Sequence, residues 1–219
     1  MDPKFWLQRW QENHIGWHKP AYNELLVQHW PKFEVKPGAK VFVPMCGKTL
    51  DMKWLVSEKH PVVGIELSHI ALEAFFDEAK LEWQEDQLGE LALLKANDYA
   101  LYCGDYFELT ADDLVGVGGV YDRGSLVAMP PKVRQRYADH VLRILPEGAS
   151  IMLVTLEYDQ HLVAGPPHCV LPEEVEALYG ERCVISVVES KTTEQVPPHF
   201  QAQGVNRAVE AVYKIVKER

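Results

Sequence analysis

The sequence predicts a doubly wound α/β fold, in which helices cover both faces of a mostly parallel sheet. From about residue 40, short apolar runs alternate with segments of helical periodicity, and no internal repeat or linker interrupts the 219 residues. The last two apolar runs, 183–190 and 208–217, have no helix between them, which predicts an antiparallel pair of strands. We expect a single domain, with a helical cover at 1–35 and an α/β core at 40–219.

Each element of the core has a local signature. Buried strands are predicted where apolar residues run together, at 40–45, 61–67, 99–107, 118–127 and 150–158. Helices are predicted at 50–59, from Ser68 as N-cap to about residue 80, at 131–145 after a proline pair, and at 172–180. The last of these begins at a proline, and Gly180 is placed to be its C-cap.

Composition excludes several classes of protein. With 22 basic and 32 acidic residues the net charge is −10, so a nucleic-acid backbone would be repelled. No apolar run is long enough for a membrane span, the N-terminus lacks a secretory signal, and the four cysteines form no CxxC pair. The nine histidines show no metal-ligand spacing. We therefore expect a cytoplasmic monomer that binds no metal, membrane or nucleic acid.

The loop after the first strand, PMCGKTLD at 44–51, resembles a phosphate-binding loop only in part. The full pattern GxxxxGK[ST] requires a glycine at position 42, which is Phe42 inside the strand. The dinucleotide pattern GxGxxG also fails, because the loop carries only Gly47. A kinase or a nicotinamide-dependent oxidoreductase of similar fold stays open only as a distant alternative.

The second and third strands end in residues that suit an adenosyl ligand. Glu66 ends the second strand, where a carboxylate can accept hydrogen bonds from the hydroxyls of a ribose. Asp105 and Tyr106 follow the third strand, where an adenine edge would lie. A ribose acid without phosphate-binding glycines favours S-adenosylmethionine over NAD.

Two further groups of residues have both a structural and a functional interpretation. Asp122 and Arg123 end the fourth strand, either as an ion pair or as part of a site. Trp6, Trp10 and Trp17 precede the first strand, and the first two share one helical face. They form either a helix packed on the core or an aromatic lid over a cation or a flat ring.

These segments together resemble the thiopurine S-methyltransferase family, particularly its bacterial members. The resemblance rests on FWLQRWQENHIGWH (5–18), VFVPMCGKTLDMKWL (41–55), VVGIELS (62–68), YCGDYF (102–107), VYDRGSLVAMPPKVRQRYADH (120–140) and GPPHCV (165–170). It extends from residue 5 to about 180 and is weaker over the last forty residues. It implies a Rossmann-like, seven-stranded methyltransferase fold and transfer of a methyl group from S-adenosylmethionine to the sulfur of an aromatic or heterocyclic thiol.

The resemblance also implies roles for individual residues. The cofactor contacts that it implies are Trp10, Met45, Glu66 and Arg123, with Gly47 in the first loop, Asp105 and Tyr106 near the adenine, and Trp17 flanking the cofactor. Arg123 is also implied near the substrate sulfur, where its charge would favour a thiolate. The chain departs from the mammalian pattern at 192–206, where no arginine precedes Arg207 and His199 is a possible substitute.

The acceptor itself stays open. The same fold methylating selenium or tellurium compounds, as part of a detoxifying activity, is the nearest alternative to a thiol methyltransferase. An acidic thiol would need no general base, because it ionises without help.

Overall fold

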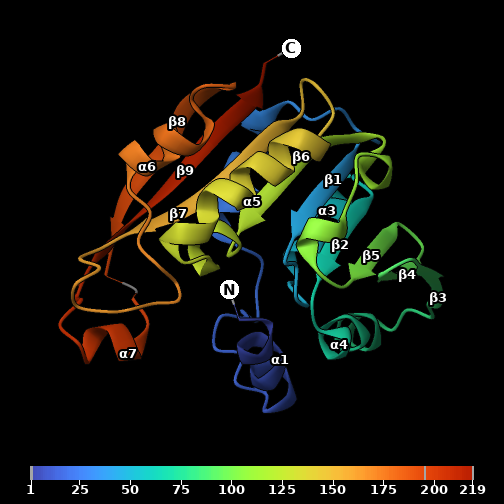
Figure 1. The fold of residues 1–219 in the computed structure, drawn as a ribbon, viewed down its shortest axis with the longest axis horizontal. Coiled ribbons are helices and arrows are strands. Elements are labelled where there is room, and N and C mark those ends of the chain that lie inside the picture. The colour runs from blue at the N-terminus through green and yellow to red at the C-terminus, as the bar shows by residue number, and fades with distance from the viewer. Residues whose placement is uncertain (1, 195, 219) are drawn as a thin grey trace. The chain divides into compact units, whose positions relative to one another are not determined.

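The computed structural model describes residues 2–194 and 196–218, and its backbone divides into two compact units (Figure 1). The N-terminal unit contains residues 2–121 and 144–146, and the C-terminal unit contains residues 122–143 and 147–218. In the part of the chain that is described, no helix is long and apolar enough to cross a membrane.

Parallel strands form the centre of the N-terminal unit. β1 (Lys40–Pro44) pairs with β2 (Val62–Glu66), and β2 pairs with β5 (Tyr99–Cys103). β6 (Val117–Arg123) pairs with the other side of β1, and its last two residues belong to the C-terminal unit. The strands are almost wholly apolar because helices bury both of their faces. All five residues of β2 are buried.

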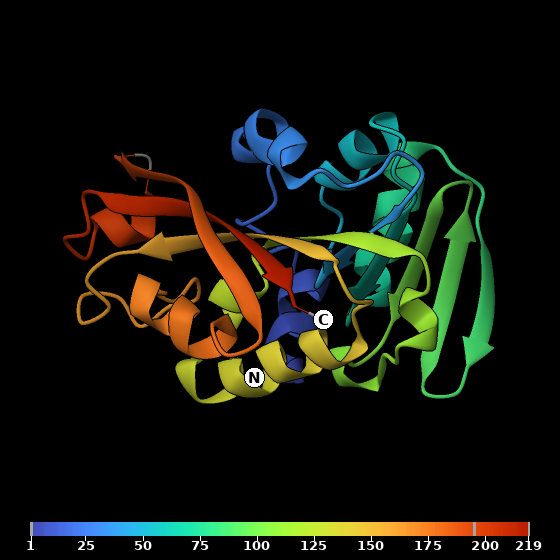
Figure 2. The same cartoon turned by 90° about the horizontal axis from the view of Figure 1, so that it is seen from above.

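A hairpin that the sequence analysis did not predict extends this sheet. β3 (Gln84–Leu88) and β4 (Leu91–Ala96) pair antiparallel, and β4 pairs antiparallel with β5, so the strand order is β3-β4-β5-β2-β1-β6. Figure 2 shows the hairpin in green. Every residue of β3 is exposed, so the strand has the polar composition of a loop. The described residues therefore contain nine strands rather than seven.

The helices of the N-terminal unit largely follow the predicted positions. α3 (Asp51–Ser57) and α4 (His69–Ala79) connect the parallel strands. Ser68 occupies the N-cap of α4 as expected, but its side chain makes no capping bond. Two short helices precede the sheet, α1 (Pro3–Gln11) and α2 (Glu24–His29), each capped by a side chain, from Asp2 and from Asn23. Three 3₁₀ turns are found at Trp30–Phe33, Tyr106–Glu108 and Asp112–Leu114.

The carboxylate of Asp51 fixes the segment that leads into α2. Asp51 is buried, its Oδ1 accepts a bond of 2.8 Å from the Asn23 N–H, and its Oδ2 accepts one of 2.9 Å from the Tyr121 hydroxyl. These bonds compensate the cost of burying a charge. The chain is therefore attached to α3 and β6 at Asn23, twelve residues after α1 ends at Gln11.

The C-terminal unit is built on three antiparallel strands. β9 (Ala208–Lys217) lies between β7 (Ser150–Glu157) and β8 (Cys183–Thr193), which confirms the predicted antiparallel pairing of the last two strands. α5 (Pro131–Ile144), whose last residue belongs to the N-terminal unit, and α6 (Pro172–Tyr179) were both predicted. Gly180 is the C-cap of α6. The unit also has a 3₁₀ turn at Leu126–Ala128 and the short α7 (Pro198–Gln201).

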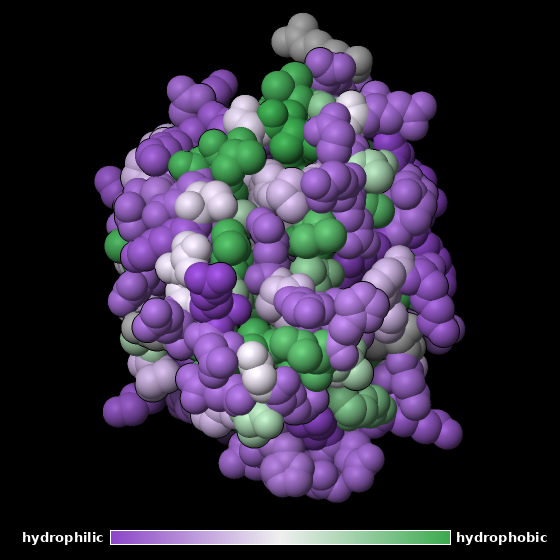
Figure 3. Space-filling view, turned by 90° about the vertical axis from the view of Figure 1, so that its left-hand side faces the viewer, coloured by the Kyte–Doolittle hydropathy of each residue, from purple (hydrophilic) through white to green (hydrophobic). Residues whose placement is uncertain are grey.

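Each unit has its own apolar core. In the N-terminal unit, Phe42, Phe75 and Phe76 are among the largest fully buried side chains. In the C-terminal unit, Phe200 is buried with Val163, Val196, Val205 and Ala208, against Leu156 and Tyr158. Figure 3 shows a face on which hydrophobic groups form separate spots among hydrophilic ones. The outermost strand β8 contributes exposed Val184 and Val187.

Candidate functional site

The carboxylate of Glu66 joins the loops that follow β1 and β2. Its Oε2 accepts a hydrogen bond of 2.9 Å from the Gly47 N–H, and its Oε1 accepts one of 2.9 Å from the Ser68 N–H. Burial raises the pKa of Glu66, and the backbone bonds from Ser68 and Gly47 act in the opposite direction. An ionised carboxylate has about four lone-pair positions, so two backbone bonds leave room for further donors.

Trp10 packs directly on this pair. Gly47 has a φ of +50°, and a Cβ at this position would lie 3.0 Å from Trp10 Cζ2 and 3.9 Å from Glu66 Oε2. A side chain here would therefore meet both strain and a steric conflict with the indole. Met45, two residues earlier, also has a positive φ of 47°. The loop is held in this conformation by the bond of 2.9 Å from the Cys46 N–H to the Ile65 carbonyl.

The three N-terminal tryptophans form one aromatic cluster. The ring of Trp17 meets Trp6 at a centroid distance of 5.2 Å and Trp10 at 5.8 Å, edge to face in both cases. Trp10 is buried, and Trp6 Nε1 is a buried donor without a partner among the described residues. The predicted helical face of Trp6 and Trp10 is confirmed, because both lie on α1.

The end of β5 lies beside the end of β2. The Gly104 N–H donates to the carbonyl of Glu66 at 3.0 Å, and Asp105 follows directly. The Asp105 side chain caps the next turn by accepting a bond of 3.0 Å from the Phe107 N–H, while Tyr106 is buried. In the N-terminal unit, then, five of the eight predicted residues follow or end β1, β2 and β5 at their carboxyl ends: Met45, Gly47, Glu66, Asp105 and Tyr106. Trp10 joins them through its contact with Gly47, and Trp17 through its contact with Trp10.

Arg123, the eighth predicted residue, belongs to the C-terminal unit and ends β6. Its neighbour Asp122 is buried, with Oδ2 accepting 2.7 Å from the Tyr137 hydroxyl and Oδ1 accepting 3.3 Å from the Leu126 N–H. Burial raises the pKa of Asp122, and the Tyr137 bond is the largest effect opposing it. An Asp122–Arg123 ion pair, one of the two expected alternatives, is not found within residues 2–194 and 196–218. The reason is that successive residues of a strand point to opposite faces of the sheet.

The segment 192–206 has its own cavity in the C-terminal unit. The cavity measures about 370 Å³, and Asp159, Glu194 and Arg207 contribute charged groups to its wall. His199 is exposed on α7, and its ring packs edge to face on Phe200 at 4.8 Å. His199 does not line this cavity. Gln195 lies outside the described residues.

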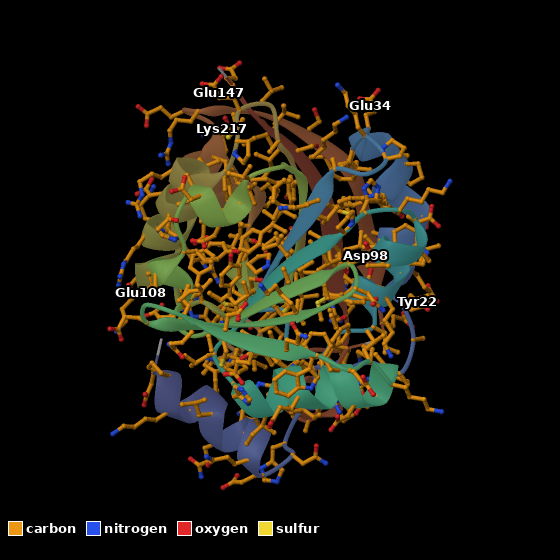
Figure 4. The ribbon with its side chains drawn as sticks, turned by 90° about the vertical axis from the view of Figure 1, so that its right-hand side faces the viewer. Tyr22, Glu34, Asp98, Glu108, Glu147 and Lys217 are labelled. Atoms are coloured by element: carbon orange, nitrogen blue, oxygen red, sulfur yellow. The ribbon has the colours of Figure 1, made fainter. Side chains whose placement is uncertain are left out.

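A larger cavity lies at the opposite edge of the N-terminal sheet. It measures about 700 Å³ and is lined by residues at the amino ends of β1, β2 and β5, including Lys40, Val62, Asp98 and Tyr99. Figure 4 shows Asp98 far from Glu108, which follows the carboxyl end of β5. Ligands of α/β sheets bind beyond the carboxyl ends, so we place the candidate site there despite the larger cavity. No group of three or more potential metal ligands is found in the described residues.

Sequence reasoning missed two structural features. The first is the backbone: the N–H groups of Gly47 and Ser68 bond Glu66, and only the lone glycine of the first loop indicated that the chain turns there. The second is the loop 158–170, which is ordered by bonds from its own Tyr158 and Gln160. The motif GPPHCV indicated this loop, but nothing in its pattern indicated what the loop contacts.

Comparison with known proteins identifies the family. The profile of the family described as Thiopurine S-methyltransferase matches residues 1–218. The chain belongs to the thiopurine S-methyltransferase family. Its relatives in this family include the thiopurine S-methyltransferase of Pseudomonas fluorescens (strain SBW25), which is 41% identical over 99% of each chain. The protein of that name from Methylococcus capsulatus is 42% identical over 97% of this chain and 96% of its own.

Solved structures of other methyltransferases share the fold. A S-adenosylmethionine-dependent methyltransferase from Anabaena variabilis superposes with a TM-score of 0.64, at 16% identity, covering 99% of this chain and 95% of its own. A Burkholderia thailandensis N1-methyltransferase with bound S-adenosylhomocysteine gives a TM-score of 0.63, at 15% identity, covering 99% and 87%. At such identities the likeness concerns the fold alone. This family member thus has a methyltransferase-like α/β fold with a mixed sheet.

Proposed function

We propose that this protein transfers the methyl group of S-adenosylmethionine to the sulfur of an aromatic or heterocyclic thiol such as a thiopurine. The observation that carries the proposal is the Glu66 carboxylate. It is held at the carboxyl edge of the sheet by two backbone donors and retains acceptor capacity toward the ribose hydroxyls of an adenosyl ligand. Membership of the thiopurine S-methyltransferase family, matched over residues 1–218, supports the same activity.

The chain's own residues would divide the work of holding the cofactor. Glu66 would accept hydrogen bonds from the ribose, and Asp105 and Tyr106 would flank the adenine. Met45 and Gly47 would present the first loop, and Trp10 with Trp17 would cover the ligand. The aromatic faces attract cations, which suits a sulfonium.

Bound S-adenosylmethionine would supply a methyl group on a sulfonium, which is open to in-line attack by a nucleophile. Arg123 would hold the acceptor sulfur as a thiolate, because a neighbouring positive charge favours the anionic form of an acid. The tryptophans would exclude water from the reacting atoms. The leaving group departs neutral, so the departure itself needs no acid.

The test is methyl transfer from labelled S-adenosylmethionine to a panel of aromatic thiols, thiopurines and selenium compounds, with each product identified by mass. We expect methyl thioethers from the thiols. Methylation of the selenium compounds alone would favour the alternative acceptor class. Cofactor binding without any methylated product would contradict the enzymatic proposal.

We also propose that the enzyme works as a monomer on small molecules. Light scattering of the purified protein should give the mass of one chain, about 25.0 kDa. A dimer mass that persists on dilution would contradict this.

A further inference from the structure

The loop 158–170, which follows β7 in the C-terminal unit, is ordered by its own side chains. The Tyr158 hydroxyl donates to the Pro167 carbonyl at 2.6 Å, and Gln160 Oε1 accepts a bond of 2.7 Å from the Cys169 N–H. These bonds hold the Pro167–Cys169 stretch from inside the loop. Figure 1 shows the loop beyond the carboxyl end of β7. His168 is therefore presented from a fixed backbone at the edge where α/β proteins bind their ligands.

A second set of contacts fixes His168 beside the segment that begins at Arg123. Its N–H donates to the Val127 carbonyl at 2.6 Å, four residues after Arg123. Its ring lies over Gly165, which has a φ of +81°, and a Cβ there would come within 2.5 Å of His168 Nδ1. Only glycine allows the imidazole to occupy this place. The side chain is half-buried, so it stays accessible to a ligand.

Arg134 of α5 carries the positive charge that faces this loop. It is fully buried, its Nε donates to the Met129 carbonyl at 3.0 Å, and its Nη1 pairs with Glu174 of α6 at 2.5 Å. Its Nη2 is buried without a partner in the described part of the chain. Only part of this guanidinium is therefore occupied by its partners, although Glu174 offsets its charge.

The surroundings favour the neutral imidazole. Burial lowers the pKa of His168, the charge of Arg134 lowers it further, and a hydrogen bond with the Ala164 backbone opposes both effects. An ordinary histidine has a pKa near 6.5, so a lowered pKa increases the neutral fraction of His168 at pH 7. A neutral imidazole keeps one ring nitrogen unprotonated, and this nitrogen can accept a proton.

We propose that His168 is the general base that takes the proton from the thiol of the acceptor. This inference rests on the proposed S-methylation. In the step, the S–H bond breaks and its proton forms an N–H bond on His168. The sulfur electron pair forms the new S–CH₃ bond as the methyl leaves the sulfonium, whose sulfur retains the electrons of the broken bond. The imidazolium then returns the proton to solvent.

The decisive experiment compares acceptors of different acidity. At pH 7, para-nitrothiophenol is largely ionised, whereas benzyl mercaptan is largely protonated and needs a base. For H168Q we expect kcat/KM to fall about a hundredfold or more with benzyl mercaptan and to stay near wild type with para-nitrothiophenol, because a general base contributes roughly 10²- to 10⁴-fold. The matched control is H161Q, an exposed histidine of the same loop, which should leave both rates unchanged.

An equal loss for both thiols, or no loss for either, would overturn the assignment of His168. These outcomes differ from a failure of the proposed function, in which the wild-type protein would methylate neither thiol.

A measurement without turnover gives a second answer. An aromatic thiolate absorbs at longer wavelength than its thiol, so para-methoxythiophenol can be titrated while bound to the wild-type complex with S-adenosylhomocysteine. We expect H168Q to lower the apparent pKa of the bound thiol, because the imidazole lone pair that accepts the S–H favours the neutral thiol, and an unchanged value would contradict the proposal.

Discussion

The carboxylate of Glu66 has two roles. It fixes the backbone of two loops through Gly47 and Ser68, and we propose that it also binds the ribose. Replacing it should therefore affect affinity and local order together. The two effects can be separated by choosing a variant that keeps the shape of the side chain.

E66Q and E66A should both bind S-adenosylmethionine more weakly. A hydrogen bond to a charged group contributes roughly 1.5–3 kcal/mol, so affinity should fall about tenfold to a hundredfold, as measured by calorimetry. E58Q, which changes an exposed glutamate at the C-cap of α3, is the control and should bind normally. Unchanged affinity in both Glu66 variants would refute the ribose role.

Arg123 should matter for turnover rather than for folding, because no described residue pairs with its guanidinium. We expect R123A to lose most of kcat/KM with a melting temperature close to wild type. R123K keeps the charge but not the planar fork, so it should restore activity only in part. Full activity in R123A would exclude the proposed contact with the acceptor, and an unfolded variant would indicate a structural role.

At the scale of elements, α1 is attached to the N-terminal unit differently from the strands. It pairs with none of them, and its contact with the first loop is made by Trp10 on Gly47. The unpartnered Nε1 of Trp6 adds a cost to burying this helix face. We propose that α1 is the lid that the tryptophans suggested from the sequence, and that it opens and closes over the cofactor.

Deleting residues 1–18 should leave a folded protein that binds the cofactor weakly and has little activity. In the full chain, tryptophan fluorescence should change when S-adenosylmethionine is added, and W10A should reduce that change. Hydrogen exchange can contradict this prediction. Equal protection of the α1 amides with and without cofactor would mean that the helix is part of the core. An unfolded truncation would mean the same.

At the scale of the whole molecule, two buried carboxylates give stability a pH dependence. Burial raises the pKa of Glu66 from 4.5 and of Asp122 from 3.8. Between the unfolded and folded values, the folded protein binds more protons than the unfolded chain. These groups therefore add stability at low pH that is lost as pH rises through their folded pKa values.

The D122N variant should lose less stability than wild type as the pH rises. We expect the free energy of unfolding of wild type, measured in denaturant from pH 4 upward, to decrease with pH relative to that of D122N. Asparagine retains an acceptor for the Tyr137 hydroxyl, so folding should survive. Parallel pH profiles for the two proteins would show that Asp122 titrates alike in both states.

The sequence predicts the central fold well and the periphery poorly, for physical reasons. Buried parallel strands such as β2 are continuous apolar runs, so periodicity and composition identify them. The exposed edge strand β3, QEDQL, carries no such signal, because its only structural requirement is backbone pairing with β4. The end of β5 was predicted too long, since Tyr106 is buried in a 3₁₀ turn rather than a strand.

The sequence predicts those residues of the candidate site whose position follows from the strand that they end. Glu66 and Asp105 follow apolar runs, so their place at the carboxyl edge follows from topology. The contact of Trp10 with Gly47 could not be predicted, because it joins segments that are more than thirty residues apart and connected by an irregular stretch. His168 is one of nine histidines, and it is distinguished by contacts that the sequence does not show, the hydrogen bond to Val127 and the packing of its ring on Gly165.

The hydrogen bond between Asp51 and Asn23 has a consequence for the kinetics of α1. Because the chain is fixed at Asn23, a released α1 stays tethered by a short stretch and keeps an effective concentration on the order of millimolar near its own binding place. Its return is a unimolecular event whose rate is independent of how much protein is present. A free peptide of residues 1–18 added to the truncated enzyme would lack this advantage, so restoring activity in trans should require millimolar peptide.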